Sequence, residues 1–217
     1  MEVEVSVVVP AYNEENDIAG CIKVILEYFT SIERGVEVLA VDDGSSDKTL
    51  QIIRDMSTTD PRIRALTNGE NRGKGYTVRH GVLQSRGELV LFTDVDLSTP
   101  IEEFQTLLDA MSSKYDVAFG SRALAKSQLK IKQPWYRMQL GRLANQAIQL
   151  VVPALRGIKD TQCGFKLFRG DVARQVFKLQ RIERWGFDFE ILHIARKYDY
   201  NVIEVPVEWS HSGDSRI

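Results

Sequence analysis

Short apolar runs alternate with amphipathic stretches along the first half of the chain. The runs are rich in β-branched residues and predict buried strands at Val3–Val9, Val36–Val41, Ile63–Thr67, Glu88–Thr93 and Asp116–Phe119. The stretches between them have helical spacing of apolar residues and predict helices at Glu14–Ser31, Asp47–Met56, Gly75–Ser85 and Ile101–Met111. Ser45 or Ser46 is available to cap the second helix. Strand and helix alternate four times with short connections, which predicts an α/β fold with a doubly wound, mostly parallel sheet.

The regular pattern ends near residue 120. A polar and basic stretch at Ser121–Gln133 is followed by a longer helical stretch at Pro134–Val152. Strands are then expected at Lys166–Phe168 and Val202–Val207, and helices at Gly170–Phe177 and Phe187–Arg196. No repeat or flexible linker separates the two parts. We therefore expect a single domain over residues 1–217, with a regular half (1–120) and an irregular second lobe (121–217).

The composition is that of an ordinary globular protein, with 43% apolar and 27% charged residues in 217. A net charge of −2 argues against a basic nucleic-acid binder. The chain has no apolar run long enough to span a bilayer and no signal-peptide pattern. Cys21 and Cys163 form no disulfide framework. These features predict a protein of the reducing cytoplasm.

The positive charge is concentrated in one part of the chain. No Asp or Glu occurs between Val117 and Lys159, and the remainder of the chain has 20 basic against 30 acidic residues. The basic residues of this segment are Arg122, Lys126, Lys130, Lys132, Arg137, Arg142, Arg156 and Lys159. The segment either binds an anion, such as a phosphate group, a membrane surface or a partner protein, or is simply a solvated basic face.

Charged side chains follow the predicted strands at the edge of the sheet where open α/β proteins bind ligands. Asp94 and Asp96 follow the fourth strand, and strand alternation would point both carboxylates the same way. Such a pair suits Mg²⁺ or Mn²⁺ held together with phosphate oxygens. The alternative is a turn whose aspartates cap the next helix. Either the second strand's Asp42 and Asp43 form a turn, or one of them accepts hydrogen bonds from a base or ribose.

Arg72 and Lys74 lie among glycines that allow close backbone approach to a base edge or a diphosphate. The chain lacks the Walker A spacing, and no G-x-G-x-x-G comes after the first strand. A P-loop nucleotidase and a standard dinucleotide dehydrogenase are therefore disfavoured.

Taken together, the strand-end motifs resemble those of the family 2 glycosyltransferases, which have the GT-A fold. The motifs are Val-Val-Val-Pro-Ala-Tyr-Asn-Glu-Glu from Val7, Val-Asp-Asp-Gly-Ser-Ser-Asp-Lys-Thr from Val41, Asn-Arg-Gly-Lys-Gly from Asn71 and Thr-Asp-Val-Asp-Leu from Thr93. In the second half, residues 119–122, 160–168 and 184–190 resemble the dolichyl-phosphate glucosyltransferases. Dolichyl-phosphate mannosyltransferases are the near relatives of that group.

The resemblance implies a role for individual residues. Pro10, Tyr12 and Glu14 would line the nucleotide pocket, Asp42 would bind the base with Asp43 beside it, and Lys74 would face the nucleotide. Asp94 and Asp96 would handle ribose, diphosphate and metal, with Asp96 the firmer metal ligand, and Gln162 would frame the sugar. Arg122 would meet the acceptor phosphate, assisted by Lys132 and Arg137 from the basic segment. Asp188 and Glu190 fall where many members hold a catalytic acidic residue, and the predicted catalytic set is Asp94, Asp96, Arg122 and Asp188.

A simpler interpretation exists for Asp188 and Glu190, and also for His211, where the resemblance to GT-A enzymes implies a late histidine in the metal shell. Asp188 lies at a helix start and could only cap that helix, and Glu190 could only be exposed. His211 is a candidate third metal ligand, whereas a lone surface histidine is the commoner outcome. Chains that this one resembles usually continue beyond the Ser215–Arg216 region, so we expect either a truncated or a minimal member.

The expected reaction is the inverting transfer of a hexose, glucose by resemblance, from UDP-glucose to a polyprenyl or dolichyl phosphate. Mg²⁺ or Mn²⁺ would neutralise the leaving diphosphate. A phosphate acceptor is already charged and needs cations, whereas a hydroxyl acceptor needs a general base. The alternatives are GDP-mannose as donor, a glycan or lipid hydroxyl as acceptor, and an idle nucleotide-sugar-binding protein.

A lipid acceptor also implies that the protein works at a membrane. We expect peripheral contact with the cytoplasmic face of a membrane through the basic segment, with Trp135 and Tyr136 at the interface unless their helix packs in the core. The sequence leaves the oligomeric state open.

Overall fold

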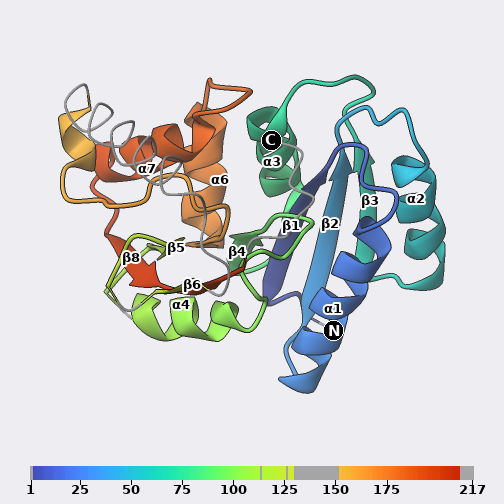
Figure 1. The fold of residues 1–217 in the computed structure, drawn as a ribbon, viewed down its shortest axis with the longest axis horizontal. Coiled ribbons are helices and arrows are strands. Elements are labelled where there is room, and N and C mark those ends of the chain that lie inside the picture. Colours follow the sequence, from blue (N-terminus) through green and yellow to red (C-terminus); the bar gives the residue numbers. More distant parts are fainter. Residues whose placement is uncertain (1, 113, 126, 130–151, 211–217) are drawn as a thin grey trace.

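The computed structural model describes residues 2–112, 114–125, 127–129 and 152–210. A seven-stranded sheet runs through the described chain in the order β3-β2-β1-β4-β7-β5-β8 (Figure 1). Its strands are β1 (Val5–Ala11), β2 (Val36–Asp42), β3 (Ile63–Thr67), β4 (Leu89–Phe92), β5 (Val117–Ser121), β7 (Lys166–Arg169) and β8 (Val202–Pro206). A small second sheet pairs β6 (Gln128–Leu129) with β9 (Glu208–Trp209), and η1 (Pro153–Leu155) is a short 3₁₀ helix. The large sheet contains strands from both halves of the sequence.

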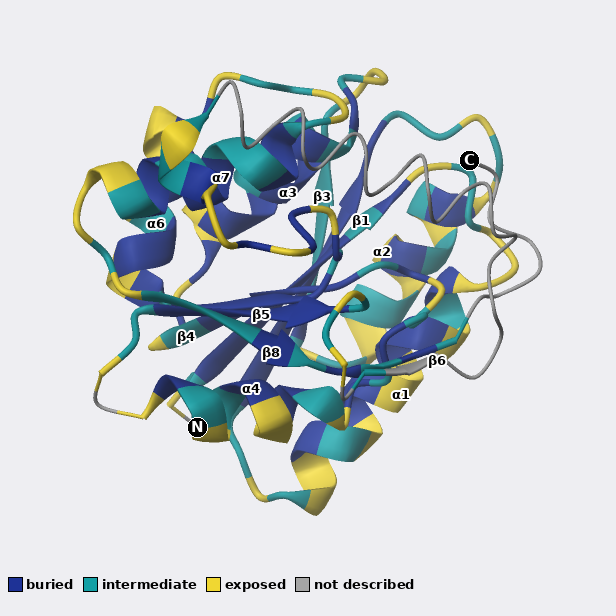
Figure 2. Ribbon diagram, turned by 60° about the vertical axis from the view of Figure 1, so that its left-hand side comes forward, coloured by how far each residue is buried: buried dark blue, intermediate teal, exposed yellow. Residues whose placement is uncertain are grey.

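Helices cover both faces of the sheet, as the strand-helix alternation predicted. One face carries α1 (Ile18–Ser31), α2 (Thr49–Thr59) and α4 (Glu103–Met111), and the other carries α3 (Lys74–Gln84), α6 (Gly170–Leu179) and α7 (Phe187–Lys197). Figure 2 shows α3, α6 and α7 above the sheet and α1 and α4 below it. Alternate side chains of β1 enter the two cores, with Val7 in the first and Val8 in the second. No helix among the described residues is long and apolar enough to cross a bilayer.

The predicted starts of the first two helices are wrong. The residues just before each helix instead form two loops that are hydrogen-bonded to each other. Helix α1 begins at Ile18 rather than Glu14, and α2 begins at Thr49 rather than Asp47. Neither Ser45 nor Ser46 caps α2. The Ser45 hydroxyl accepts the backbone N–H of Asn13, and the backbone N–H of Ser46 donates to the Asn13 side chain. Side chains in these two loops therefore form inter-loop contacts in place of the expected cap.

β7 is the one strand of the large sheet that runs antiparallel to its neighbours. Its first residue, Lys166, pairs with Phe92 near the end of β4 and with Phe119 of β5. The residues that precede β7 therefore lie at the same edge as the residues that come after the parallel strands. Inspection of the strand ends alone does not find this segment, which the sequence placed in the site only through the family resemblance of residues 160–168.

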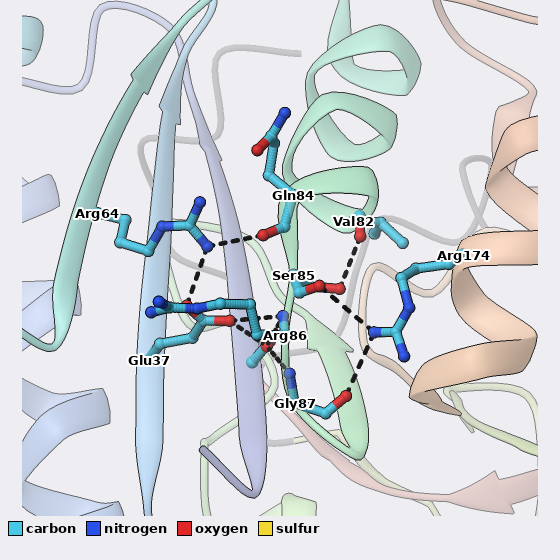
Figure 3. A network of polar contacts seen from close by, with 9 residues as sticks. Glu37, Arg64, Val82, Gln84, Ser85, Arg86, Gly87 and Arg174 are labelled. Atoms are coloured by element: carbon cyan, nitrogen blue, oxygen red, sulfur yellow. Dashed lines mark hydrogen bonds and ion pairs between the residues drawn. The ribbon is translucent and has the colours of Figure 1, made fainter. Parts of the chain in front are cut away.

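A polar network at the opposite edge of the sheet fixes the connection between α3 and β4 (Figure 3). Glu37 is only 1% exposed, accepts a hydrogen bond from Ser6, and forms ion pairs with Arg64 at 3.0 Å and Arg86 at 2.7 Å. Burial alone would raise the pKa of Glu37, but these hydrogen bonds outweigh it and hold the pKa below its ordinary value. Arg174 of α6 donates to the carbonyls of Ser85 and Gly87 on the other side of the connection.

Candidate functional site

An ion pair joins the start of α3 to the loop after β4. The ammonium of Lys74 lies 2.5 Å from Oδ1 of Asp94. Burial alone would lower the pKa of Lys74, but the negative charges of Asp94, Asp188 and Asp96 outweigh it and raise this pKa. Two carboxylates of the turn after β4 and one from α7 therefore act on the pKa of one ammonium group, and Asp94 contacts it directly.

The turn after β4, and not the pleat of the strand, sets the positions of Asp94 and Asp96. β4 ends at Phe92, so the strand alternation expected to align the two carboxylates does not apply. Asp96 accepts hydrogen bonds from the backbone N–H and the hydroxyl of Ser98. Burial raises the pKa of the Cys21 thiol on α1, and the charges of Asp96 and Asp94 raise it further. Both carboxylates thus lie near the same point on α1.

Asp42 and Asp43 are both buried and both brace loops. Asp42 accepts hydrogen bonds from the backbone of Gly44 and Ser45 and from the Thr67 hydroxyl. Asp43 accepts the backbone N–H groups of Arg72 and Gly73, each at 2.8 Å, and a hydrogen bond from Asn68. The carboxylate of Asp43 therefore fixes the loop that leads to Lys74. Asp42 would have to share its oxygens between this turn and a base.

The other residues predicted to line the nucleotide pocket lie beside Asp42. Ala11 pairs with Asp42 in the sheet, so Pro10 and Tyr12 flank the position that faces it. The side chain of Tyr12 is 48% exposed at this edge. The backbone N–H of Glu14 donates to the Thr49 hydroxyl, which ties this loop to the start of α2.

The loop that carries Arg72 packs against residues 180–187 from the second half of the chain. Arg72 Nη2 lies 2.9 Å from Oε1 of Glu183, and the backbone N–H of Tyr76 donates to the Glu183 carbonyl. A Cβ atom at Gly73 or Gly75 would lie 2.9 Å from that same carbonyl oxygen. Two glycines are thus required for this close approach, which couples the two halves of the chain.

Gly164, just before β7, lies directly against the Asp94 carboxylate. A Cβ atom at this position would come within 2.3 Å of Asp94 Oδ2, which is far closer than real contacts allow. Gln162 is exposed nearby, and its backbone N–H donates to Asp160. The segment of residues 160–165 therefore packs on the same carboxylate that contacts Lys74.

A buried ion pair lies behind this segment. Lys166 is fully buried, and its ammonium donates to Oδ1 of Asp188 and to the Cys163 carbonyl, each at 2.5 Å. Asp188, in the first turn of α7, is 3% exposed. Its carboxylate is thus engaged by an ammonium group, and that ammonium also holds the backbone next to Gly164. Glu190 is half-buried and accepts the backbone N–H groups of Arg181 and Ile182, so it braces the loop before α7.

Arg122 comes after β5 and is paired with a carboxylate that comes just after the basic segment. Its Nε lies 2.7 Å from Asp160 Oδ2, its Nη2 lies 2.9 Å from Oδ1, and its guanidinium lies over the Trp209 ring. Burial alone would lower the pKa of Arg122, but Asp160, and to a smaller extent Asp188, raise it. In turn, Arg122 holds the pKa of Asp160 below its ordinary value against the effect of burial. The negative charge of Asp188 therefore contributes to raising the pKa of both Arg122 and Lys74.

The family model "Glycosyl transferase family 2" matches residues 6–177. This chain belongs to glycosyl transferase family 2. A dolichyl-phosphate beta-glucosyltransferase of Trichomonas vaginalis is 39% identical to it over 226 residues, which cover 100% of this chain and 66% of the relative. The human dolichyl-phosphate beta-glucosyltransferase is 32% identical, with 99% of this chain and 69% of the relative covered. The chain thus spans about two thirds of the length of these relatives.

Solved structures of the GT-A fold are similar in shape. Glucosyl-3-phosphoglycerate synthase of Mycobacterium tuberculosis, in complex with Mn²⁺, UDP and glucosyl-3-phosphoglycerate, matches with a TM-score of 0.66 at 17% identity, covering 95% of this chain and 71% of that one. Mannosyl-3-phosphoglycerate synthase of Rubrobacter xylanophilus matches with a TM-score of 0.73 at 16% identity, covering 99% and 68%. The GT-A fold expected for this family 2 member is confirmed.

The carboxylates of this family 2 site fit a hard divalent cation. Asp94 and Asp96 offer the oxygen ligands that Mg²⁺ and Mn²⁺ prefer. Among the described residues, no group of three His, Cys, Asp or Glu side chains could hold a metal ion. A cation here would take its other ligands from a diphosphate and water. His211, Lys132 and Arg137, which the sequence predicted as metal or phosphate ligands, lie outside the described residues.

Reasoning from the sequence missed three residues that organise this site. Asp160 pairs with Arg122, Lys166 pairs with Asp188, and Asn68 donates to Asp43. A signal for Lys166 was present, because it is the charged residue within the apolar run Phe-Lys-Leu-Phe of β7. A lysine buried in such a strand requires an acidic partner. For Asp160, the corresponding signal is the first carboxylate after a long acid-free segment.

Proposed function

We propose that this family 2 member transfers glucose from UDP-glucose to dolichyl or another polyprenyl phosphate, with inversion at the anomeric carbon. The observation that carries the proposal is that Lys74 contacts Asp94 after β4 and that Arg122 follows β5, whose end lies at the same edge of the sheet as the end of β4. A cation suited to the donor diphosphate and a cation suited to an acceptor phosphate thus lie at one edge of the sheet. The glucosyltransferases at 32–39% identity support glucose and dolichyl phosphate.

On the donor side, Lys74 would exchange its contact with Asp94 for the diphosphate. Asp94 and Asp96 would hold Mg²⁺ or Mn²⁺, which when bound neutralises charge on the leaving diphosphate. Pro10, Tyr12, Glu14 and Asp42 would line the uridine pocket, with Asp43 keeping the Arg72 loop in place. Gln162 and Gly164 would border the sugar. The fold-level match to a structure crystallised with UDP and Mn²⁺ agrees with this assignment.

On the acceptor side, the phosphate is itself the nucleophile. One of its oxygens forms a bond to the anomeric carbon while the bond from that carbon to the diphosphate breaks, and the diphosphate leaves with the electron pair. Arg122 keeps N–H donors beyond the two that contact Asp160, and these would bind the incoming phosphate. Lys132 and Arg137 remain predicted ligands of the acceptor phosphate. The protein would work peripherally at the cytoplasmic face of a membrane that contains the acceptor.

The decisive experiment offers the protein a panel of donors and acceptors. UDP-glucose, UDP-galactose and GDP-mannose are each incubated with Mn²⁺ or Mg²⁺ and with either a polyprenyl phosphate or a glycan acceptor. We expect hexosyl polyprenyl phosphate from UDP-glucose, identified by mass, with the β configuration assigned by NMR. Transfer only to a glycan hydroxyl, an α product, or UDP binding with no turnover on any acceptor would overturn the proposal.

Asp188→Asn separates a phosphate acceptor from a hydroxyl acceptor. With a phosphate acceptor no general base is needed, so the fraction that remains folded keeps most of its rate. With a hydroxyl acceptor and Asp188 as base, the rate falls by several orders of magnitude. Because Asp188 also partners Lys166, rates are normalised to the folded fraction measured by circular dichroism.

A further inference from the structure

A cationic and apolar surface lies beside the site, where the end of α6 meets α3 and the loop before α7. We call it the α6 corner and define it by the exposed or partly exposed side chains of Arg79, Lys178, Leu179, Arg181, Arg184 and Trp185. Trp185 is 61% exposed and Leu179 is 42% exposed. Arg79, Lys178 and Arg181, together with Leu179 and Gln180, line an open cavity of about 420 Å³. None of these described lining residues is acidic.

The acidic side chains next to the α6 corner are already used within the protein. Glu183 pairs with Arg72, and Glu190 accepts the backbone N–H groups of Arg181 and Ile182. Neither carboxylate forms an ion pair with Lys178 or Arg181 in the described chain. The corner therefore presents positive charge beside exposed apolar surface, which is the composition that suits an anionic interface.

The loop that carries Trp185 is anchored at several points. The Gln180 side chain donates to the carbonyls of Gly75 and Ile182, and the Glu183 carbonyl accepts the N–H of Tyr76. Trp185 is therefore exposed on a loop fixed on both sides, not on a frayed end. Tryptophan is the residue most typical of the boundary between water and lipid, where an apolar ring with one polar edge is favourable.

We propose that the α6 corner docks on an anionic phospholipid bilayer. Lipid headgroup phosphates would occupy the cavity lined by Arg79, Lys178 and Arg181, and the side chains of Leu179 and Trp185 would enter the interface. The loop continues directly into α7, whose first turn carries Asp188, and it packs on Gly73 and Gly75 next to Lys74. Docking here would bring the site edge to the membrane that holds a polyprenyl phosphate. In this respect the inference rests on the proposed function.

Vesicle flotation of the full chain tests the docking surface. Phosphatidylcholine vesicles with and without phosphatidylserine are compared at low salt, using wild type, Trp185→Ser, and the double variant Lys178→Glu/Arg181→Glu. Matched controls are Tyr198→Ser at the far end of α7 and Lys23→Glu/Arg54→Glu on the opposite face of the sheet. We expect phosphatidylserine-dependent binding that falls about 25-fold or more in the double charge variant, since each basic residue contributes about fivefold. Trp185→Ser should lose about tenfold, because its large apolar side chain no longer enters the interface. Both controls should bind like wild type.

The same proteins are assayed with a water-soluble, short-chain polyprenyl phosphate and with a long-chain one in vesicles. The corner variants should match wild type on the soluble acceptor and lose about tenfold on the vesicle-bound one. Corner variants that float like wild type, controls that lose as much binding as they do, or a wild type that fails to float would overturn the docking surface even if transfer is intact. Normal flotation without transfer to any lipid phosphate would overturn the proposed function instead.

Discussion

Lys74 and Asp94 contact each other across two loops, with 2.5 Å between Nζ and Oδ1. The contact joins the start of α3 to the turn after β4, and Asp96 and Asp188 lie close enough to raise the pKa of the same lysine. The Lys74 ammonium can therefore exchange its carboxylate partner for another anion. When a diphosphate and a divalent cation enter, the diphosphate can take Lys74 while the cation takes the carboxylates. Substitutions at this pair, at its supports and at the opposite edge of the sheet should each have a distinct effect.

Replacing Lys74 should weaken donor binding in particular. Lys74→Met removes the ammonium proposed to bind the diphosphate, and we expect the KM for UDP-glucose to rise about 10- to 100-fold, the usual effect of losing a charge-assisted hydrogen bond. Lys74→Arg, which keeps the charge, should recover part of the loss. Donor and acceptor titrations check this. An unchanged donor KM, or an equal rise in the acceptor KM, would contradict the assignment.

Gly164→Ala should damage catalysis far more than folding. The new Cβ atom would lie 2.3 Å from Asp94 Oδ2, so the carboxylate must move. A displacement of about 1 Å at a reacting site can cost about 100-fold in rate, which is the loss we expect here. Gly20→Ala in α1 is the matched control, because a Cβ atom there has nothing within 4 Å. The control should keep wild-type activity and be slightly more stable. Equal rates for the two variants would show that the Gly164 contact is unimportant.

The contributions of Lys166 and Asp188 to the free energy of unfolding should be coupled. Removing one partner leaves a buried charge unpaired, so Lys166→Met and Asp188→Asn should each lower the free energy of unfolding by about 3–5 kcal/mol. The double variant should lose clearly less than the sum of the two, since it leaves no unpaired charge. Urea unfolding of the four proteins gives the coupling energy. Additive losses would mean that the 2.5 Å contact contributes no interaction energy.

Stability at low pH should reflect Glu37. Its pKa in the folded protein lies below the ordinary value of 4.5. The stabilisation from Ser6, Arg64 and Arg86 is therefore fully present above about pH 4.5 and is lost as the pH falls below it through the folded-state pKa. Glu37→Gln should be less stable at neutral pH by about 2 kcal/mol and should lose less on acidification. Urea midpoints measured at several pH values below neutrality check both statements.

The direction of β7 and the hydrogen-bond partners of Asp42 and Asp43 could not be predicted from the order of strands along the chain. The sequence predicted that the residues after β1, β2 and β4 would meet at one edge, because parallel strands all end there. It could not show that β7 runs the other way, which brings Gly164 to Asp94 from the strand's start. Nor could it show that Asp42 and Asp43 both brace loops, because this depends on which backbone N–H groups the folded loops present.

The sequence by itself determined the strand-helix alternation, the family motifs and most of the candidate residues. These depend on local periodicity and on residue types at fixed spacing, which are visible along the chain. Only the tertiary structure decided the partners: Lys74 with Asp94, Arg122 with Asp160, and Lys166 with Asp188. Each pair joins residues at least 20 positions apart, and a charge is satisfied by whichever opposite charge the packed sheet places within a few ångströms. That distance is set by strand order and direction, and neither is written in local sequence.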